Sequence, residues 1–222
     1  MKYPAVYSYK KTDTMELWLS ILTLRNIKEW NGEVYIVGDK PFGDDVLPPY
    51  SYIYLKIKHN WGKESNCRSN DEICAYQTAA EIVGDFIMMA DDIFILKPWS
   101  LTRHNRGLID DHIKKRGIRD SYMLQLKSTS KWLKSHNKPT LSYELHIPFL
   151  VKADKLLEIV DIIPRIKDGV LIRSVYGNWF DEPSTPLDDT KNKPITDKTV
   201  IHSSSNKLFD YEEINSYVIK IN

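Results

Sequence analysis

Two adjacent carboxylates, Asp91 and Asp92, lie between the apolar runs 86–90 and 93–96. Ionised carboxylates side by side repel each other, and at the end of a buried segment they cost free energy unless a cation compensates them. Mg²⁺ or Mn²⁺ would compensate them, and both ions also bind diphosphate oxygens. The pattern therefore favours a metal-assisted site that stabilises a departing diphosphate. The alternative is a turn in which the two acids face water or cap backbone N–H groups.

A second polar pair, Glu144 and His146, alternates with Leu145 and Ile147. In an extended segment, alternate side chains share one face, so the two polar groups would lie together. Either group can act as a general base that takes a proton from an acceptor hydroxyl. We expect this pair to be catalytic, and a charged pair on the surface is the alternative.

The elements that must position these residues follow from hydrophobic patterning. In the first half of the chain it predicts strands at 5–9, 33–38, 51–57 and 86–90, and helices at 15–30 and 70–83. Right-handed crossovers favour one mostly parallel sheet flanked by helices, which is an α/β fold. Ligands bind at the carboxyl ends of such strands. Tyr7, Ser8 and Asp39 lie at these ends, as Asp91 and Asp92 do.

The second half of the chain is less regular. Its pattern predicts a strand at 121–126, helices at 153–162, 169–180 and 209–219, a short strand at 199–202, and a mobile loop rich in Pro, Asp and Lys at 181–194. We expect a single domain over residues 1–222, in which 1–98 form a nucleotide-binding half and 99–222 an acceptor half.

The composition narrows the class of protein. Lys and Arg number 31 against 30 Asp and Glu, so the chain lacks the basic excess of a general nucleic-acid binder. Its two cysteines are too few for a secreted disulfide scaffold. The N-terminus lacks the apolar core of a signal peptide, and no apolar run reaches the length of a membrane span. We therefore expect a cytoplasmic protein.

The stretch 84–94, Gly-Asp-Phe-Ile-Met-Met-Ala-Asp-Asp-Ile-Phe, resembles the strand-plus-acid motif of GT-A-fold glycosyltransferases, which carry an Asp-x-Asp-like element there. It is also similar to the Asp-Asp-x-Phe motif of stealth-type sugar-phosphate transferases. Ala90 occupies the first acidic position of Asp-x-Asp, so the motif is degenerate and metal binding would rest mainly on Asp92. Residues 17–39 are similar to the opening helix and second strand of these families, and 200–203 to the late strand-His element of GT-A enzymes.

The resemblance covers residues 5–98 and 199–205, and it implies a GT-A-like, Rossmann-type sandwich. It implies a transferase that moves a sugar from a nucleotide sugar, a UDP-sugar above all, to a hydroxyl acceptor. A saccharide or a modified DNA base would suit as acceptor, as for a compact enzyme of phage or bacterial type. His202 would join Asp91 and Asp92 around Mn²⁺ or Mg²⁺; otherwise it is an ordinary histidine of the core or surface.

In such a transferase, Tyr7, Ser8 and Asp39 at the strand ends would line the nucleotide pocket. Arg68, at a helix N-terminus, suits a diphosphate or sugar hydroxyls. Lys207 would contact a phosphate; the alternative is a solvated lysine. Two alternatives stay open. One is a stealth-like transferase that moves a sugar phosphate and releases a nucleoside monophosphate. The other is a non-catalytic α/β binding protein with a degenerate site.

Overall fold

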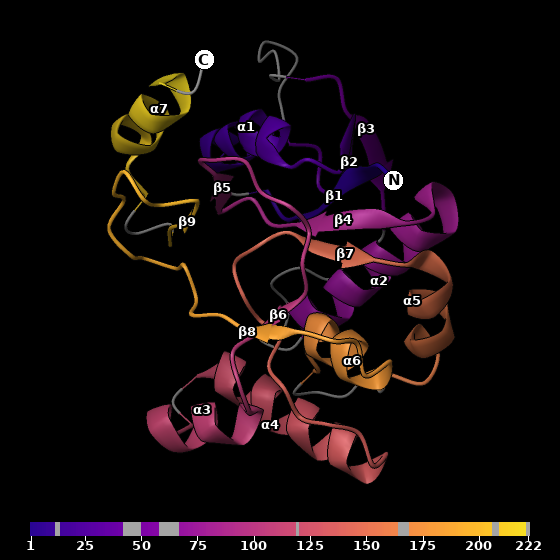
Figure 1. Ribbon diagram of the computed structural model, residues 1–222. Coiled ribbons are helices and arrows are strands. Elements are labelled where there is room, and N and C mark those ends of the chain that lie inside the picture. The colour runs from indigo at the N-terminus through magenta and orange to yellow at the C-terminus, as the bar shows by residue number, and fades with distance from the viewer. Residues whose placement is uncertain are drawn as a thin grey trace.

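A five-stranded mixed sheet forms the centre of the computed structural model, which describes residues 1–11, 14–41, 50–57, 67–118, 120–163, 169–205 and 209–220 (Figure 1). Its strands, in spatial order, are β3 Ile53–Lys56, β2 Trp30–Gly38, β1 Tyr3–Tyr9, β4 Phe86–Met89 and β7 Phe149–Val151. The first four are parallel, and β7 runs antiparallel to β4. The predicted α/β class is confirmed.

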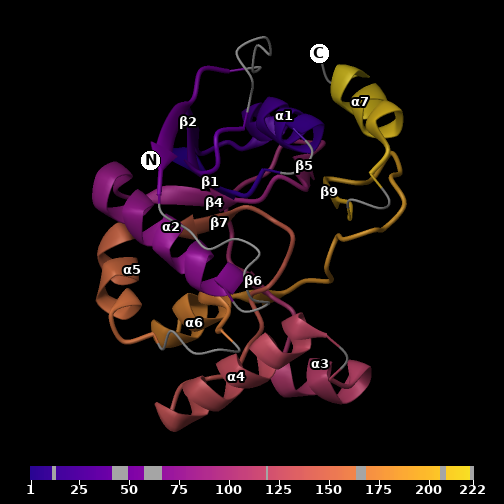
Figure 2. The ribbon, with the colours of Figure 1, turned by 180° about the vertical axis from the view of Figure 1, so that it is seen from behind.

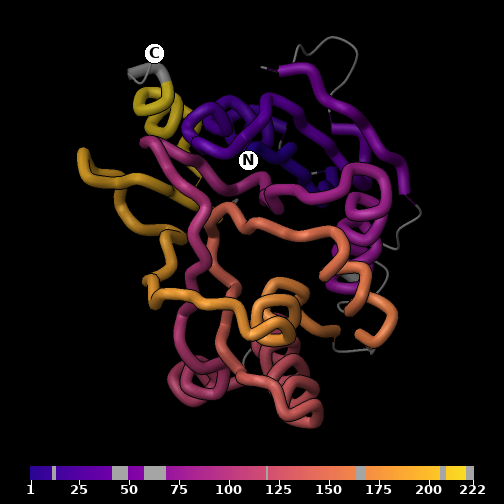
Figure 3. Tube along the Cα trace, turned by 45° about the vertical axis from the view of Figure 1, so that its right-hand side comes forward, coloured from indigo at the N-terminus to yellow at the C-terminus, as the bar shows by residue number. Residues whose placement is uncertain are grey.

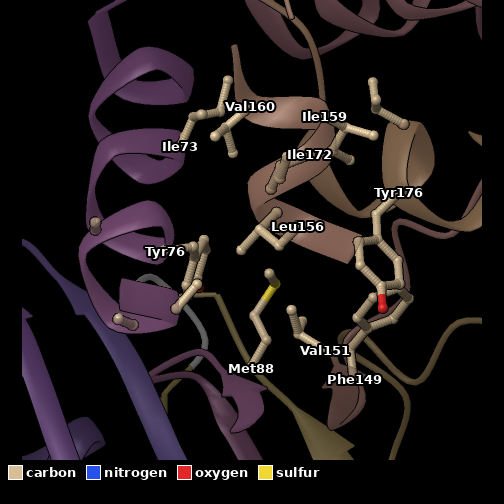
Figure 4. Close-up of a cluster of buried hydrophobic side chains, with 14 of the residues drawn as sticks. Ile73, Tyr76, Met88, Phe149, Val151, Leu156, Ile159, Val160, Ile172 and Tyr176 are labelled. Atoms are coloured by element: carbon tan, nitrogen blue, oxygen red, sulfur yellow. The ribbon is translucent and has the colours of Figure 1, made fainter. Parts of the chain in front are cut away.

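Both faces of the sheet are buried, because alternate side chains of β1 and β4 enter two different cores. Ala5 and Ile87 belong to the core that contains α1 Thr14–Thr23, whereas Val6 and Met88 belong to the core on the opposite face. This second face is covered by α2 Cys67–Val83, α5 Ala153–Val160 and α6 Ile172–Trp179 (Figure 2). Figure 4 shows side chains of all three helices packed around Met88.

Short strand pairs and further helices lie around this sheet. β5 Ile93–Ile95 pairs antiparallel with β9 Ile201–Ser203, and β6 His104–Asn105 pairs parallel with β8 Thr185–Pro186. The other elements are the 3-10 helix η1 Leu24–Asn26 and the helices α3 Ile109–Arg116, α4 Ser121–Ser135 and α7 Tyr211–Lys220. Between the sheet and the α3–α4 pair, the segments 103–107, 141–142 and 185–187 run side by side and are joined by backbone hydrogen bonds (Figure 3). None of the described helices is long and apolar enough to cross a membrane.

The predicted strand at 121–126 is wrong, because this segment forms the first turns of α4. The Asp120 carboxylate caps the helix by accepting a hydrogen bond from the backbone N–H of Met123 (2.9 Å). Met123 and Leu126 are buried three positions apart and pack with Ile109 of α3. Six residues span fewer than two helical turns, so this segment by itself does not distinguish a helical period from an extended strand.

The predicted helix at 15–30 is shorter than expected, since α1 ends at Thr23 and β2 already begins at Trp30. Asn26, in η1 between them, donates a hydrogen bond from Nδ2 to the carbonyl oxygen of Ile95 (2.6 Å). This bond ties the turn after α1 to β5 and directs the chain back toward the sheet.

The strand order creates a topological switch point between β1 and β4. The chain moves outward from β1 to β2 and β3, and then returns to the other side of β1 to form β4. In open α/β sheets, ligands bind beyond the carboxyl ends of the strands at such a point. Tyr7 pairs with Met89, so Ser8 and Ala90 are the next residues along this edge.

Candidate functional site

A cavity of about 450 Å³ lies at this switch point. It is lined by the ends of β1 and β4, the first turns of α2 and α4, the segment 144–146 and the start of α6. The predicted site residues that line it are Ser8, Asp91, Asp92, Glu144 and His146. The fold therefore brings the acidic pair and the alternating polar pair into one cavity.

Arg173, in the first turn of α6, holds the segment that carries the alternating pair. Its Nη1 donates hydrogen bonds to the carbonyl oxygens of Leu145 (2.7 Å) and Ile147 (3.0 Å). Glu144 and His146 line the cavity, whereas Ile147 packs into the apolar core. The segment that Arg173 holds therefore brings both polar residues to the cavity, and Leu145 between them lines it as well.

Glu144 joins the cavity wall to the N-terminus of α6. Its Oε1 accepts hydrogen bonds from the backbone N–H of Ser174 (2.9 Å) and from the Ser174 hydroxyl (2.8 Å), which satisfies a free donor of the first helical turn. Burial raises the pKa of Glu144 above its ordinary value, although the Arg173 charge and the bonds from Ser174 act in the opposite direction. A carboxyl group that retains its proton more readily than usual is better suited to exchange that proton as a general acid or base.

His146 is held in one orientation by an acid and a base. Its Nδ1 lies 2.9 Å from Oδ1 of Asp189, and Lys191 Nζ donates to its Nε2 over 3.1 Å. Because an ammonium group only donates, Nε2 accepts and the ring proton lies on Nδ1. Burial alone would raise the pKa of Asp189, but its hydrogen bonds with His146 and the charge of Arg106 hold that pKa far below the ordinary range. Asp189 is therefore an ionised partner that orients the imidazole.

A protein cation accompanies the acidic pair. Asp91 and Asp92 form the turn between β4 and β5, and Lys191 Nζ lies 3.0 Å from Oδ2 of Asp92. The Asp92 side chain is 16% exposed and that of Lys191 32%, so water screens this ion pair less than a pair on the open surface. The repulsion between adjacent carboxylates, which predicted a divalent cation, is thus relieved in part by Lys191.

His202 does not join the two aspartates. β9 pairs with β5 so that His202 lies opposite Phe94, and the two rings stack with their centroids 6.2 Å apart. His202 lines a second, mostly apolar cavity of about 310 Å³, next to Trp99. Across the described ranges of the chain, no group of three or more His, Cys, Asp or Glu side chains is placed to hold a metal ion. The predicted ligand set of Asp91, Asp92 and His202 is therefore not assembled.

The two predicted nucleotide-pocket residues of β1 have different surroundings. Tyr7 is buried in the core, and its hydroxyl is 3.0 Å from the Ser20 hydroxyl, which donates to the carbonyl oxygen of Ile93 (2.7 Å). Tyr7 therefore braces β1 against α1 and β5 and does not line the cavity. Ser8 does line it, and its buried Oγ has no hydrogen-bond partner in the described part of the protein.

The other predicted donor-binding residues either do not line the cavity or lie outside the part of the chain that the structure describes. Asp39 accepts a hydrogen bond from the backbone N–H of Lys11 (2.9 Å), so its carboxylate ties the loop after β1 to the end of β2. Arg68 lies in the first turn of α2, but its side chain is outside the described part. Lys207 lies outside the described residues altogether.

Asp189 and Lys191 were not predicted as site residues, although both come from the segment 181–194. Its Pro, Asp and Lys content predicts only a mobile loop, and composition carries no information on where its charged side chains are placed. The one available signal was that a catalytic histidine is usually oriented by an acid. Many acids of the chain could have filled that role.

Comparison with known proteins does not assign the chain to a family. No protein-family model matches the chain, and no curated protein sequence matches it. The functional argument therefore rests on the geometry of the polar cavity and on the residues that line it.

Proposed function

We propose that this protein is a transferase that moves a sugar from a nucleotide-sugar donor to a hydroxyl acceptor in the polar cavity. The observation that carries the proposal is the meeting of three groups at the switch point of the sheet. They are an imidazole oriented by Asp189, a raised-pKa carboxyl at Glu144, and the cations Lys191 and Arg173. Such a cavity supplies both a base for the acceptor and positive charge for a leaving diphosphate.

The reaction assigns one task to each kind of group. The bond between the anomeric carbon and the diphosphate oxygen breaks, and the negative charge that develops on that oxygen is stabilised by the cations. The acceptor oxygen forms the new bond to the anomeric carbon, while its proton passes to His146 or Glu144. Lys191 donates to His146 Nε2 in the structure, so a phosphate that attracts Lys191 would also free this nitrogen to act as the base.

The test is a donor screen with the purified protein. Several nucleotide sugars are incubated with and without Mn²⁺, and the nucleotides released by slow hydrolysis are separated by chromatography. Release of UDP or GDP is the expected result. Release of a nucleoside monophosphate would instead show transfer of a sugar phosphate, and no release from any donor would contradict the proposal.

A matched pair of histidine variants ties the activity to this cavity. His146→Gln should lower the rate by at least about tenfold, because a positioned base contributes about 10²- to 10⁴-fold. His136→Gln is the control, since His136 is exposed at the C-terminal end of α4 and does not line the cavity. Equal rates for the two variants would separate the activity from His146.

A further inference from the structure

We infer that the donor's diphosphate is bound by two protein cations, Lys191 and Arg173, in the place where the acidic motif suggests a divalent metal ion. The inference rests on the proposed function and names the groups that hold its donor. It follows from the contacts of Lys191, from the burial of Arg173 and from the position of His202.

Lys191 occupies the position expected for a metal ion, between a carboxylate and an imidazole. Its Nζ lies 3.0 Å from Asp92 and 3.1 Å from His146. A divalent ion bound to Asp92 would have to displace this ammonium group or lie beside it, and two like charges at such distances repel. The histidine that the motif would add as a third ligand, His202, lines the other cavity.

Arg173 is a buried cation that forms no direct ion pair with an acid among the described residues, although its charge acts on Glu144. Its side chain lines the cavity, the residue is 9% exposed, and no carboxylate in the described part of the chain lies within ion-pairing distance. Nη1 binds two carbonyl oxygens and Nε contacts the sulfur of Met88 (3.3 Å), whereas Nη2 has no hydrogen bond to the described residues. Among the described residues, no carboxylate is hydrogen-bonded to this buried charge, and a guanidinium group that is already held in place is well suited to a phosphate.

The two cations converge on one short segment. Arg173 binds the carbonyl oxygens of Leu145 and Ile147, and Lys191 contacts the imidazole of His146 between them. A diphosphate that contacts both cations would therefore lie next to the proposed base.

Acidic residues also line the cavity, and one of them is Asp91, which directly precedes Asp92 in the chain. An anion bound without metal should be repelled by Asp91, whereas a metal-bound anion should depend on it.

The experiment measures binding of pyrophosphate and of UDP to the full chain by calorimetry, in EDTA and then in Mn²⁺ or Mg²⁺. We expect binding in EDTA that changes less than about threefold when metal is added. Lys191→Met should weaken binding by about tenfold or more, because a charge-assisted bond to phosphate is lost. The control Lys193→Met removes a neighbouring lysine whose side chain is 56% exposed, and it should leave binding unchanged.

Two further variants keep the inference falsifiable if Lys191→Met fails to fold. Arg173→Lys retains the charge but loses the planar fork, so it should weaken UDP binding by about threefold or more. Asp91→Asn should tighten binding by about twofold or more, because a repelling carboxylate is removed. Binding that requires metal, or that Asp91→Asn abolishes, would overturn the inference, as would the absence of any binding in EDTA.

The binding experiment and the donor screen can fail independently of each other. Binding of UDP in EDTA without turnover of any nucleotide sugar would support the two-cation site and reject the transferase. Turnover that occurs only with Mn²⁺ or Mg²⁺ would support the transferase and reject the two-cation site.

Discussion

His146 Nδ1 lies 2.9 Å from Oδ1 of Asp189, although the two residues are 43 positions apart in the chain. The other carboxylate oxygen of Asp189 lies 3.1 Å from Nη1 of Arg106, so the acid is fixed between two partners. The imidazole consequently keeps one tautomer and one orientation, with Nε2 toward Lys191 and the cavity. Tertiary structure, rather than any local motif, assembles this acid–histidine pair.

Asp189→Asn should lower the turnover of the donor by about 10- to 100-fold, while the affinity for UDP changes little. An amide no longer stabilises the imidazole when it takes up a proton, and it can hold the ring in the wrong tautomer. Steady-state kinetics would measure kcat, and calorimetry would measure UDP binding. Asp188→Asn is the control, because that neighbouring side chain is 98% exposed. A similar fall in both variants would argue against an orienting role for Asp189.

Glu144→Gln should make the protein up to about 1 kcal/mol more stable at neutral pH. Burial raises the pKa of Glu144 in the folded state, against the opposing effects of Arg173 and Ser174. A raised pKa means that the folded state binds the proton more tightly, so this contribution to stability is present at low pH and is lost as pH rises through the folded value. The glutamine keeps an acceptor for Ser174 but carries no charge.

Urea unfolding of wild type and Glu144→Gln at several pH values between 4 and 8 would measure the difference. The advantage of the variant should shrink as pH falls toward the ordinary pKa of glutamate, where both proteins are uncharged at this position. A variant that is less stable than wild type at pH 8 would show that the ionised carboxylate stabilises the N-terminus of α6 more than burial penalises it.

Local patterning predicts the sheet and part of the site well. The run 86–90 is apolar at every position, and β4 lies inside the sheet, between β1 and β7, with both faces covered. Asp91 and Asp92 then line the cavity because the carboxyl end of that strand meets the switch point. The alternation of Glu144 and His146 with apolar residues also depends on neighbouring positions alone. Such features can be predicted from a sequence because they depend on the pattern of a few consecutive residues.

The parts of the site that local patterning does not predict depend on contacts between residues far apart in the chain. His202 lies in a short late strand, β9, but whether it faces the acidic pair depends on the register of β9 with β5, which sets it opposite Phe94. Lys191 reaches Asp92 across 99 positions of sequence. The choice between a metal ion and a lysine as partner of the acidic pair is therefore made by tertiary structure, and the same carboxylates are compatible with both.

His202 should make the protein sensitive to acid. Burial lowers its pKa, although Glu213, the backbone of Lys193 and Asp92 act in the opposite direction. A lowered histidine pKa means that the unfolded chain binds the proton more readily, so stability is full above the ordinary value and is lost as pH falls toward the lowered value. The free energy of unfolding should therefore decrease between about pH 7 and pH 5.

His202→Gln should flatten this dependence, which urea unfolding at each pH would measure. His136→Gln is the control, because His136 is exposed and its removal should leave the slope unchanged. Parallel curves for wild type and His202→Gln would assign the acid sensitivity to other groups of the protein.

Gly38, the last residue of β2, should be intolerant of a side chain. Its φ is +131°, and a Cβ atom there would lie 2.2 Å from the carbonyl oxygen of Tyr9, which accepts the hydrogen bond from Asp39 N (2.9 Å). Gly38→Ala must therefore strain the backbone and push β1 and β2 apart beside Ser8, at the edge of the cavity. We expect a loss of stability of about 2–4 kcal/mol and weaker UDP binding.

Gly32, in the same strand, separates the two causes of this loss. Its φ is +97°, but a Cβ atom would meet nothing within 4 Å. Gly32→Ala therefore carries the conformational strain without the collision, and it should cost only about 1 kcal/mol and leave UDP binding intact. Urea unfolding and calorimetry of both variants would measure the contrast. Equal losses would mean that the close approach of Gly38 to Tyr9 does not shape the carboxyl edge of the sheet.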